Sequence, residues 1–501
     1  MKTLKRAELI VRRDLTLGTV LERLAAIHGS RRLVEEADGG LRITYRQGAK
    51  RVARWAGGIA AKTDLGDRVV IATPNGYEMF LLCLAASRAG AIPVPINEQM
   101  RPDEIDHVLR DSGASLVVRT PNDVDGHDPL LEAEPADPDD IAALFYTSGT
   151  TGKPKGAELT HKALVGQALS GVAWPAELRR DEAVFALPVA HIMGFAVLMI
   201  MGCAGVPAYL IPHFRPDTVL DAIEERRASV FIGVPAMYRM LLEAGAADRD
   251  LSCVRLWGAG ADVMPPELAQ TFKRFGATAT LPVIGPIGEA LFAEGYGMVE
   301  SGGGVAAKIS PPLLNLGLGE SVGIQLPSYK LKVVDDDGEE VGHGEVGELW
   351  VRGPGVLKGY WNAPEITADT VTTDGWLRTG DLARRGPFGT VLFVGRAKDV
   401  IKHGGYSVYA NEVQATLEEH PDVLEAAVVG LPDDRVGERP AAVVRLADGA
   451  AFDEGAMVAW AGEHLADYKV PQRIVVVDEL PRTGTKKVQK RLLLELFPTD
   501  A

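Results

Sequence analysis

Short apolar segments alternate with amphipathic segments through the first third of the chain. Residues 68–73, 91–96 and 114–119 are predicted to be β-strands, because each is a short apolar run bounded by turn-forming residues. Residues 77–88 and 102–112 have the spacing of apolar positions that is typical of helices. Apolar strands that alternate with such helices predict parallel strand pairs joined by right-handed crossovers.

One long uncharged stretch, residues 184–214, has the composition of a membrane span but not its continuity. Glycines and prolines interrupt it at positions 188, 194, 202, 205, 207 and 212. Because these residues break regular structure, we predict a strand, a helix and a second strand in a buried core. A transmembrane helix is the less favoured interpretation.

The pattern changes in the second half of the chain. Residues 229–275 continue the alternation of strands and helices. Residues 321–361 then carry short alternating segments with the turn sequences DDDG and GHGE, which predict an antiparallel sheet or a small barrel. After residue 396, helical and strand-like segments form a further unit of about 100 residues, which is within the usual size of a domain.

These patterns together predict an α/β protein with two domains. We expect a large N-terminal domain over residues 1–395, with parallel α/β sheets and a small β-barrel-like part at about 320–395. A hinge at residues 396–398 would connect it to a smaller, mobile α+β domain over residues 399–501.

The net charge and the positions of the cysteines limit the classes of function that the protein can have. The 501 residues include 53 Lys and Arg against 68 Asp and Glu, a net charge of −15. A wide nucleic-acid footprint needs a basic face, so that class is disfavoured. Cys83, Cys203 and Cys253 fit neither metal-ligand spacing nor a disulfide framework. We expect buried free thiols in a reducing cytoplasm.

A basic stretch near the C-terminus, LPRTGTKKVQKR (residues 480–491), admits three interpretations. LPRTG fits the pattern that anchors proteins to bacterial cell walls. However, the N-terminal residues contain no apolar signal region, and the apolar run 492–497 is too short to cross a bilayer. A nucleic-acid patch fits poorly with the net charge of −15. The third interpretation places one of these lysines in an active site.

Residues 146–156, YTSGTTGKPKG, combine three kinds of anion-binding group. Gly149, Gly152 and Gly156 allow backbone N–H groups to converge on a phosphate. Pro154 stands where a Walker loop has its magnesium-binding Ser or Thr, so this is not a Walker loop. A flexible surface loop is the alternative to a polyphosphate cradle. The side chains that favour the cradle are Thr147, Ser148, Thr150, Thr151, Lys153 and Lys155.

This loop resembles the signature of the adenylate-forming enzymes, which include acyl-CoA and aryl-CoA ligases, luciferases and peptide-synthetase adenylation domains. Further motifs follow in that family's order as far as Lys490. The resemblance implies two half-reactions: a carboxylate attacks the α-phosphate of ATP to give acyl-AMP and pyrophosphate, and a thiol, usually that of CoA, then displaces AMP. The first half-reaction brings two anions together, so it needs Mg²⁺ and cations at the developing charge.

The resemblance assigns the nucleotide site to two segments. In GYGMVE, Tyr296 would lie against the adenine and Glu300 would hold Mg²⁺, for which a carboxylate is a suitable ligand. In WGAGAD, the glycines would permit close approach of the nucleotide, although a plain strand-to-helix turn is an alternative. The AMP-binding residues implied by these two segments are Gly258, Ala259, Gly260, Tyr296, Gly297, Met298 and Val299.

Val299 departs from the family pattern, which has Thr before the glutamate. The change removes a hydroxyl, and a hydrogen bond to a charged phosphate is worth about 1.5–3 kcal/mol. Lys486 is a second departure, because the family has a glycine before its catalytic lysine. Both positions serve adenylation, so one alternative is a ligase that only joins preformed acyl-AMP to CoA.

Two further motifs imply ribose and acyl contacts. Asp381 of WLRTGDL would accept hydrogen bonds from the ribose hydroxyls, and Arg396 would reach the ribose or a phosphate; surface salt bridges are the alternative for both. His191 of PVAHIMGF would lie beside the carboxylate and gate the acyl pocket, with a buried structural histidine as its alternative. The other acyl-pocket residues predicted are Phe195, Met237 and Gly302.

The two half-reactions need different surroundings, because a lysine that clamps carboxylate and phosphate obstructs the thiol. The family rotates its C-terminal domain between the steps, and the resemblance places that hinge at Lys398. CoA would bind at the KHGGY segment, for which a tight hairpin turn is also expected. The CoA-binding residues implied are Lys402, Gly404, Gly405 and Tyr406.

The final lysine of the family lies six residues beyond a proline, which is Lys487 when counted from Pro481. With Glu300 and His191 it would form the catalytic set, bridging the carboxylate and the α-phosphate. We therefore expect a cytoplasmic acyl-CoA ligase for a monocarboxylic, lipid-like or bulky hydrophobic acid. Its cofactors would be ATP or AMP, Mg²⁺ and coenzyme A. We expect no nucleic-acid partner and no transmembrane segment, and the oligomeric state, including a homodimer, is left open. The alternatives are the adenylation-deficient ligase, a luciferase-like oxidase and a non-catalytic adenylate-binding protein.

Overall fold

The described residues of the computed structural model are 6, 9, 14–97, 99–147, 153–174, 180–281, 283–311, 321–386, 390–447, 449–483 and 487–497. They form two compact units, and each is described by itself below. The first unit comprises Met1–Lys330 and Val351–Leu377, and the second comprises Leu331–Trp350 and Arg378–Ala501. The hinge at residues 396–398 lies within the second unit in this division, and its role stays a prediction.

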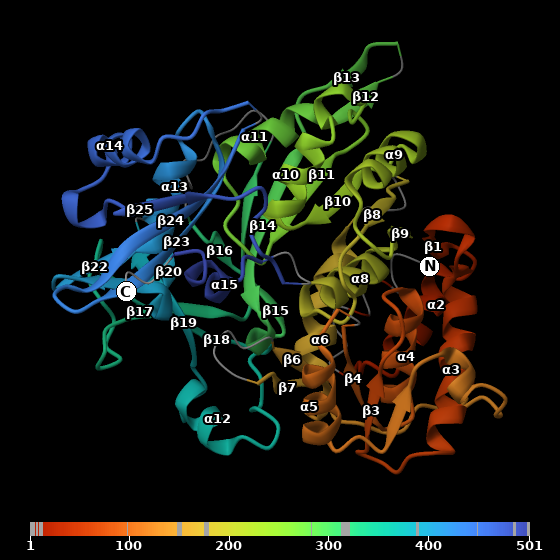
Figure 1. Ribbon diagram of the computed structural model, residues 1–501. Helices are drawn as coiled ribbons and strands as arrows, with labels where there is room; N and C mark the ends of the chain where they lie inside the picture. Colours follow the sequence, from red (N-terminus) through yellow and green to blue (C-terminus); the bar gives the residue numbers. More distant parts are fainter. Residues whose placement is uncertain are drawn as a thin grey trace. The chain divides into compact units, whose positions relative to one another are not determined.

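A nine-stranded sheet forms the centre of the first unit (Figure 1), in the order β16-β15-β14-β11-β10-β8-β9-β1-β2. The pairs from β14 through to β1 are all parallel, whereas β2, β15 and β16 add antiparallel edges. The predicted parallel α/β architecture is thus confirmed. The strands are β1 (Arg32–Glu36), β2 (Arg42–Thr44), β8 (Ala183–Phe185), β9 (Ala208–Leu210), β10 (Val230–Gly233), β11 (Leu256–Gly260), β14 (Leu291–Met298), β15 (Gly303–Ser310) and β16 (Ile324–Gln325).

The strands and helices predicted in the first third of the chain form a second parallel sheet. Its order is β4-β3-β5, with α4 (Tyr77–Arg88) and α5 (Pro102–Ser112) as the crossover helices. Two antiparallel pairs, β6 with β7 and β12 with β13, complete the strands of this unit. Their bounds are β3 (Arg68–Ile71), β4 (Ile92–Pro95), β5 (Leu116–Val118), β6 (Ile141–Thr147), β7 (Lys155–Thr160), β12 (Ala279–Leu281) and β13 (Gly285–Ile287).

The uncharged stretch at residues 184–214 is β8, a helix and β9, as predicted. That helix, α8 (Ile192–Ala204), is buried on most of its surface. In the part of the chain that the structure describes, no helix is long and apolar enough to span a bilayer. The other helices of the unit are α2 (Val20–His28), α3 (Tyr45–Ala60), α6 (His161–Ala168), α9 (Pro216–Arg226), α10 (Pro235–Glu243), α11 (Pro266–Phe275) and α12 (Pro364–Thr370), with 3₁₀ turns η1 (Ala37–Gly39), η2 (Pro121–Val124), η3 (Leu169–Ala173), η4 (Ala246–Asp248) and η5 (Val299–Ser301).

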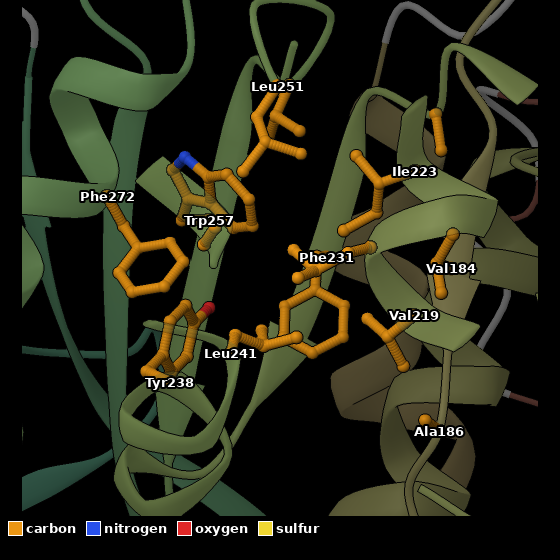
Figure 2. Close-up of a cluster of buried hydrophobic side chains, with 14 of the residues drawn as sticks. Val184, Ala186, Val219, Ile223, Phe231, Tyr238, Leu241, Leu251, Trp257 and Phe272 are labelled. Atoms are coloured by element: carbon orange, nitrogen blue, oxygen red, sulfur yellow. The ribbon is translucent and has the colours of Figure 1, made fainter. Parts of the chain in front are cut away.

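An aromatic cluster fixes the end of β11 (Figure 2). Trp257 on β11 packs edge-to-face on Phe272 of α11, with ring centroids 5.1 Å apart, and Tyr238 of α10 lies 4.9 Å from the same phenylalanine. Each such pair contributes about 0.5–1.5 kcal/mol beyond the area it buries. The Tyr238 hydroxyl donates a hydrogen bond of 2.6 Å to the carbonyl of Gly258. The core therefore holds the backbone of the WGAGAD segment directly.

The first sheet of the second unit has the order β17-β18-β19-β20. Of the two forms that the sequence predicts, antiparallel sheet or barrel, the described strands form an open sheet, in which the outer strands β17 and β20 do not pair with each other. The strands are β17 (Lys330–Val334), β18 (Val346–Arg352), β19 (Leu377–Arg385) and β20 (Val391–Arg396).

The rest of the second unit is an α+β fold, as predicted. Its sheet has the order β22-β21-β24-β23, with β25 paired to β24. Apolar side chains of this sheet pack with those of two helices, α13 and α14, into one core. The elements are β21 (Val400–His403), β22 (Tyr406–Tyr409), β23 (Val423–Asp433), β24 (Gly437–Leu446), β25 (Arg473–Val476), α13 (Ala410–Glu418), α14 (Glu454–His464) and α15 (Lys490–Leu494), with 3₁₀ turns η7 (Ala397–Asp399) and η8 (Asp467–Lys469).

Candidate active site

The predicted phosphate loop connects the two strands of an antiparallel pair. Thr147, the last residue of β6, lies opposite Lys155, the first residue of β7. The ends of the loop are therefore fixed by strand pairing, next to each other. Ser148, Gly149, Thr150, Thr151 and Gly152 lie outside the described residues, so their predicted contacts with phosphate stay predictions.

Helix α5 supports this strand pair from the side. Its His107 Nε2 lies 2.8 Å from the carbonyl oxygen of Pro154, just after the undescribed part of the loop. Its Asp111 accepts a hydrogen bond of 2.7 Å from the Tyr146 hydroxyl. Burial, together with the Asp111 carboxylate, raises the pKa of Tyr146, so this phenol stays a neutral donor. Both ends of the loop are thereby held by one helix.

The predicted metal ligand lies close to the phosphate-loop lysine. Glu300 is in the 3₁₀ turn η5, directly after β14. Its Oε1 accepts a hydrogen bond of 2.8 Å from the Tyr360 hydroxyl. The Lys155 ammonium lies over the ring of that tyrosine, 5.5 Å from the ring centroid. The structure thus brings the Glu300 carboxylate to the hydroxyl, and the Lys155 ammonium to the ring, of a single tyrosine side chain.

Sequence reasoning missed Tyr360. The tyrosine lies on a short segment that pairs with β7: Lys358 N donates to Glu158 O, and Trp361 N donates to Gly156 O. The backbone N–H of Leu357 donates a hydrogen bond of 2.9 Å to the carbonyl of Glu300. The segment is irregular, so its pattern of apolar residues predicts no strand; the available signal was the run of two aromatic residues after Gly359, just before a helix.

The donor set around Glu300 fits Mg²⁺ bound mainly through a nucleotide. Mg²⁺ in such sites takes one or two carboxylates and completes its shell with phosphate oxygens and water. Across the described residues, no three His, Cys, Asp or Glu side chains gather into a metal cluster. A single carboxylate beside a phosphate loop matches that arrangement, and the hydrogen bond from Tyr360 orients it.

The two segments predicted to bind the adenosine lie on adjacent strands. β11 and β14 pair in parallel, with Gly260 opposite Gly295. A Cβ at Gly258 would lie 2.9 Å from Ile232 Cγ1, which requires a small residue there. A Cβ at Gly297 would overlap the Gly303 carbonyl oxygen at 2.0 Å. The predicted AMP-binding residues Gly258, Ala259, Gly260, Tyr296, Gly297, Met298 and Val299 are thus brought together at the ends of two neighbouring strands.

Hydrogen bonds to Ser301 hold the turn that carries Val299 and Glu300. Met298 N donates to Ser301 Oγ at 3.0 Å, and that hydroxyl donates to Gly303 O at 2.7 Å. Gln167 Nε2 donates to the carbonyl of Ser301 at 3.0 Å. Ser301 is 1% exposed, so these bonds lie in a buried site. The conformation of this turn is consequently fixed on both sides of Glu300, the predicted metal ligand.

The predicted acyl-pocket residues fall into two kinds. His191 precedes α8, and its Nδ1 accepts a hydrogen bond of 3.2 Å from the backbone N–H of Met193. Phe195, on the same helix, is 1% exposed and packs on Phe80 and Phe145 with centroid distances of 4.9 and 5.3 Å. Met237 is likewise buried, on α10. Phe195 and Met237 are therefore part of the packed core, and their contact with an acyl group stays a prediction.

Gly302 and its neighbours lie against helices α6 and α8. Gly302 has φ +66°, and a Cβ there would lie 3.2 Å from Ala163 Cβ. A Cβ at Gly303 would lie 3.6 Å from Ala196 Cβ, and one at Gly260 would lie 3.4 Å from Met193 Cε. α8 carries no Asp, Glu, Lys or Arg. The surroundings of these glycines on the α8 side are thus uncharged.

In the second unit, the two residues predicted to bind ribose lie opposite each other. Asp381 on β19 pairs with Arg396 on β20, and Arg396 Nε lies 3.0 Å from Asp381 Oδ1. The Asp381 side chain is 2% exposed, whereas the arginine is 42% exposed. The carboxylate is therefore held in a fixed direction by a cation that solvent reaches.

The predicted hinge residue lies among charged neighbours. Burial lowers the pKa of Lys398, and the nearby cations Arg396 and Lys490 lower it further, while Asp399 opposes the shift. Lys490, from α15, lies 3.0 Å from Asp399 Oδ2. The end of the LPRTGTKKVQKR stretch therefore contacts the residue that follows Lys398.

The KHGGY segment is a two-residue hairpin turn between β21 and β22. His403 lies opposite Tyr406, and Gly404 and Gly405 have φ angles of +57° and +86°. Two consecutive positive φ angles define a type I′ turn, for which glycine is preferred. The Lys402 ammonium donates a hydrogen bond of 3.0 Å to Ser407 Oγ. The expected hairpin is confirmed, and its contact with CoA stays a prediction.

The stretch around Lys487 is folded onto the second unit. Arg482 and Val488 form an isolated antiparallel bridge, and Thr483 N donates a hydrogen bond of 2.8 Å to Lys487 O. The Arg482 guanidinium forms an ion pair with the buried carboxylate of Glu425. Residues 484–486, which include Lys486, lie outside the described residues, and Lys487 follows them directly. These contacts on both sides fix the backbone of Lys487, which the sequence predicts to be catalytic.

Comparison with known proteins defines the class. The model of the AMP-binding enzyme family matches residues 21–134 and 120–361, and that of the AMP-binding enzyme C-terminal domain matches residues 412–487. A feruloyl-CoA synthase of an Amycolatopsis species is 36% identical over 90% of this chain and 93% of its own. A long-chain-fatty-acid–CoA ligase of Mycobacterium tuberculosis is 31% identical over 96% of this chain and 98% of its own. The chain belongs to the AMP-binding enzyme family.

Solved structures agree with this class. ATP-bound MatB from Rhodopseudomonas palustris superposes with a TM-score of 0.85 at 29% identity, covering 96% of this chain and 99% of that one. The O-succinylbenzoate coenzyme A synthetase of Bacillus subtilis, in complex with ATP and a magnesium ion, has a TM-score of 0.80 at 27% identity, covering 94% of this chain and 98% of that one. The protein is accordingly an AMP-forming acid–thiol ligase that uses ATP, Mg²⁺ and coenzyme A. The adenylation-deficient and non-catalytic alternatives are not favoured.

Proposed function

We propose that this enzyme activates a monocarboxylic acid with an aromatic or long apolar body and transfers it to coenzyme A. The observation that carries the proposal is the array of Lys155, Tyr360 and Glu300, which places a phosphate-binding cation beside a metal-binding carboxylate. Such an array suits the attack of a carboxylate on a magnesium-bound triphosphate, because charge on the phosphates must be neutralised as the bond forms.

Each residue of the proposed site has a role in one of the two half-reactions. Lys153 and Lys155 bind the β- and γ-phosphates, and Glu300 would hold Mg²⁺, which would offset part of the charge of the triphosphate. Tyr296 and the glycines of β11 hold the adenine, and Asp381 with Arg396 holds the ribose. Lys487 bridges the carboxylate and the α-phosphate in the first step. Lys402, Gly404, Gly405 and Tyr406 receive CoA in the second step, after rotation at Lys398.

The class of acid follows from the uncharged surroundings of the predicted acyl pocket. Met193 and Ala196 of α8 lie against Gly260 and Gly303, and the helix offers no cation for a second carboxylate. Burying an unpaired carboxylate is costly, so a dicarboxylic acid is disfavoured. The names of the relatives are consistent with this, since they include a feruloyl-CoA synthase, a long-chain-fatty-acid–CoA ligase and an indoleacetate–CoA ligase.

A panel of acids tests the proposal. Ferulate, indoleacetate, a long-chain fatty acid and a short dicarboxylic acid are each incubated with ATP, Mg²⁺ and CoA, and the thioester and AMP are quantified by chromatography. We expect AMP and thioester in equal amounts from at least one aromatic or long apolar acid, and none from the dicarboxylic acid. Turnover of the dicarboxylic acid alone would contradict the proposed class, and the absence of any thioester would contradict the proposed reaction.

A cytoplasmic location is proposed on separate grounds. All three cysteines are free and buried, which suits a reducing compartment. Fractionation of cells that produce the protein, with an antibody against it, tests this location.

A further inference from the structure

Tyr360 connects two parts of the active site that are far apart in the sequence. Its hydroxyl donates to Glu300 Oε1 at 2.8 Å across 60 residues of chain. Its ring lies under the ammonium of Lys155, 5.5 Å from Nζ to the centroid. The side chain is 9% exposed, so neither contact is made through a freely moving surface group.

The backbone beside Tyr360 is fixed on both sides. An isolated antiparallel bridge pairs Tyr360 with Ala157 on β7, the strand that begins with Lys155. Leu357, three residues earlier, donates its N–H to the carbonyl of Glu300. The phenol is therefore placed by backbone hydrogen bonds to each of the two elements that its side chain contacts.

The chemistry of the contact suits a metal site. A carboxylate can rotate and present either of its two oxygens to a metal. The hydrogen bond from the Tyr360 hydroxyl to Oε1 fixes the orientation of the Glu300 carboxylate. Groups that orient a metal ligand in this way typically contribute a factor of about 10–100 to metal affinity or activity.

We propose that Tyr360 is a positioning residue for the magnesium carboxylate, and that it sets the distance between Glu300 and the phosphate-loop cation Lys155. This inference rests on the proposed role of Glu300 in binding Mg²⁺. It predicts that loss of the hydroxyl acts on adenylation through its Mg²⁺ dependence and leaves the thioester step intact, because AMP displacement from acyl-AMP involves no triphosphate.

The test is ATP–pyrophosphate exchange measured against Mg²⁺ concentration for the wild-type enzyme and Tyr360→Phe. The phenylalanine keeps the ring over which Lys155 lies and removes only the hydroxyl. We expect the Mg²⁺ concentration for half-maximal exchange to rise about ten-fold or more. Thioester formation from synthetic acyl-AMP and CoA is measured on the same sample. Its rate should remain within about two-fold of wild type, which is the size of effect expected from a harmless substitution. This rate therefore reports that the variant is folded.

Tyr209→Phe is the matched control. Tyr209, on β9, also has a cation over its ring, since the Arg226 guanidinium carbon lies 4.0 Å from its centroid. Tyr209 has no part in the proposed site, so the Mg²⁺ dependence of exchange in Tyr209→Phe should equal that of the wild-type enzyme.

A double-mutant cycle with Glu300→Gln separates positioning from a general structural effect. If the phenol acts through the carboxylate, Tyr360→Phe should add little to the effect of Glu300→Gln. Equal Mg²⁺ dependence in wild type and Tyr360→Phe, or fully additive effects in the double variant, would overturn the inference. Exchange by the wild type that does not depend on Mg²⁺ would overturn the proposed role of Glu300 instead. If Tyr360→Phe also loses the thioester step, the residue serves the fold and the inference fails.

Discussion

Asp381 and Arg396 face each other across two neighbouring strands, with the buried carboxylate 3.0 Å from the exposed guanidinium. The carboxylate is buried on its strand and faces a cation that solvent reaches. A carboxylate that is already buried has little hydration to lose when it accepts hydrogen bonds from the proposed ribose diol. The pair is thus a well-defined element of the proposed ribose site.

Asp381→Asn is expected to raise the KM for ATP about ten-fold or more, because hydrogen bonds to a charged acceptor are worth about 1.5–3 kcal/mol. ATP titration of pyrophosphate exchange measures this. The exposed Asp434 of the same unit provides a control, and Asp434→Asn should leave the KM unchanged. An unchanged KM for ATP in Asp381→Asn would show that Asp381 does not bind the ribose.

Lys487→Ala is expected to abolish activation of the acid by ATP and largely to spare thioester formation from acyl-AMP. The reason is that, in its proposed role, Lys487 neutralises the carboxylate and the α-phosphate only while their bond forms. The two half-reactions are assayed separately on one preparation. Arg491→Ala, an exposed cation four residues away, should affect neither. If Lys487→Ala also leaves exchange intact, adenylation relies on other residues.

Gly405→Ala is expected to slow thioester formation while exchange continues. Its φ of +86° is unfavourable for alanine, by about 1–2 kcal/mol, and no atom lies within 4 Å of the added Cβ. Any change in the rate of thioester formation therefore comes from the altered turn or from the added Cβ, which would stand in the proposed path of the CoA thiol. Gly449→Ala is a matched control in the same unit, with φ +81° and equally open space. Equal loss of activity in both variants would mean that only folding is affected.

The stability of the first unit should fall between pH 6.5 and 4. Burial lowers the pKa of His161 from 6.5 to about 4, and its Nδ1 accepts a hydrogen bond of 3.0 Å from the backbone N–H of Leu17. In this window the unfolded chain binds a proton that the folded chain does not, so the stabilisation is complete above pH 6.5 and is lost as the pH falls towards 4. The change amounts to about 3 kcal/mol at about 1.4 kcal/mol per pKa unit.

Urea titrations at several pH values measure this change. His161→Gln should be less stable than wild type at pH 7 and should lose less stability on acidification. His127 is exposed, and His127→Gln should follow the wild-type curve. Identical pH dependence in His161→Gln and wild type would show that other groups cause the acid sensitivity.

The elements with regular apolar patterns could be predicted from the sequence to within a few residues. β3, α4 and α5 lie where the pattern of apolar residues places them, because local side-chain spacing and burial on one face determine them. The motif residues Asp381 and Arg396, which the resemblance assigns to one ribose site, lie opposite each other on neighbouring strands, and their contact with ribose stays a prediction. In these cases a local pattern or a known motif carries the information.

The contacts that were missed depend on pairing between distant segments. The bond between Tyr360 and Glu300 requires that residues 357–361 return to β7, and no local pattern encodes that return. Phe195 shows a second reason, since helical periodicity marks an inward-facing side chain but does not tell a packed core from a pocket. Its contacts with Phe80 and Phe145 are set by tertiary packing.

The three buried thiols have a practical consequence for testing the proposed domain rotation. Burial raises the pKa of each, and that of Cys203 reaches about 12, so the reactive thiolate form is suppressed. A maleimide dye added to the folded protein should therefore leave all three unlabelled. Cysteines introduced at exposed positions, one in each unit, would then be the sites of labelling in an otherwise wild-type chain. Energy transfer between two such dyes, compared with ATP and with CoA bound, can test the proposed movement at Lys398 without first removing a native cysteine.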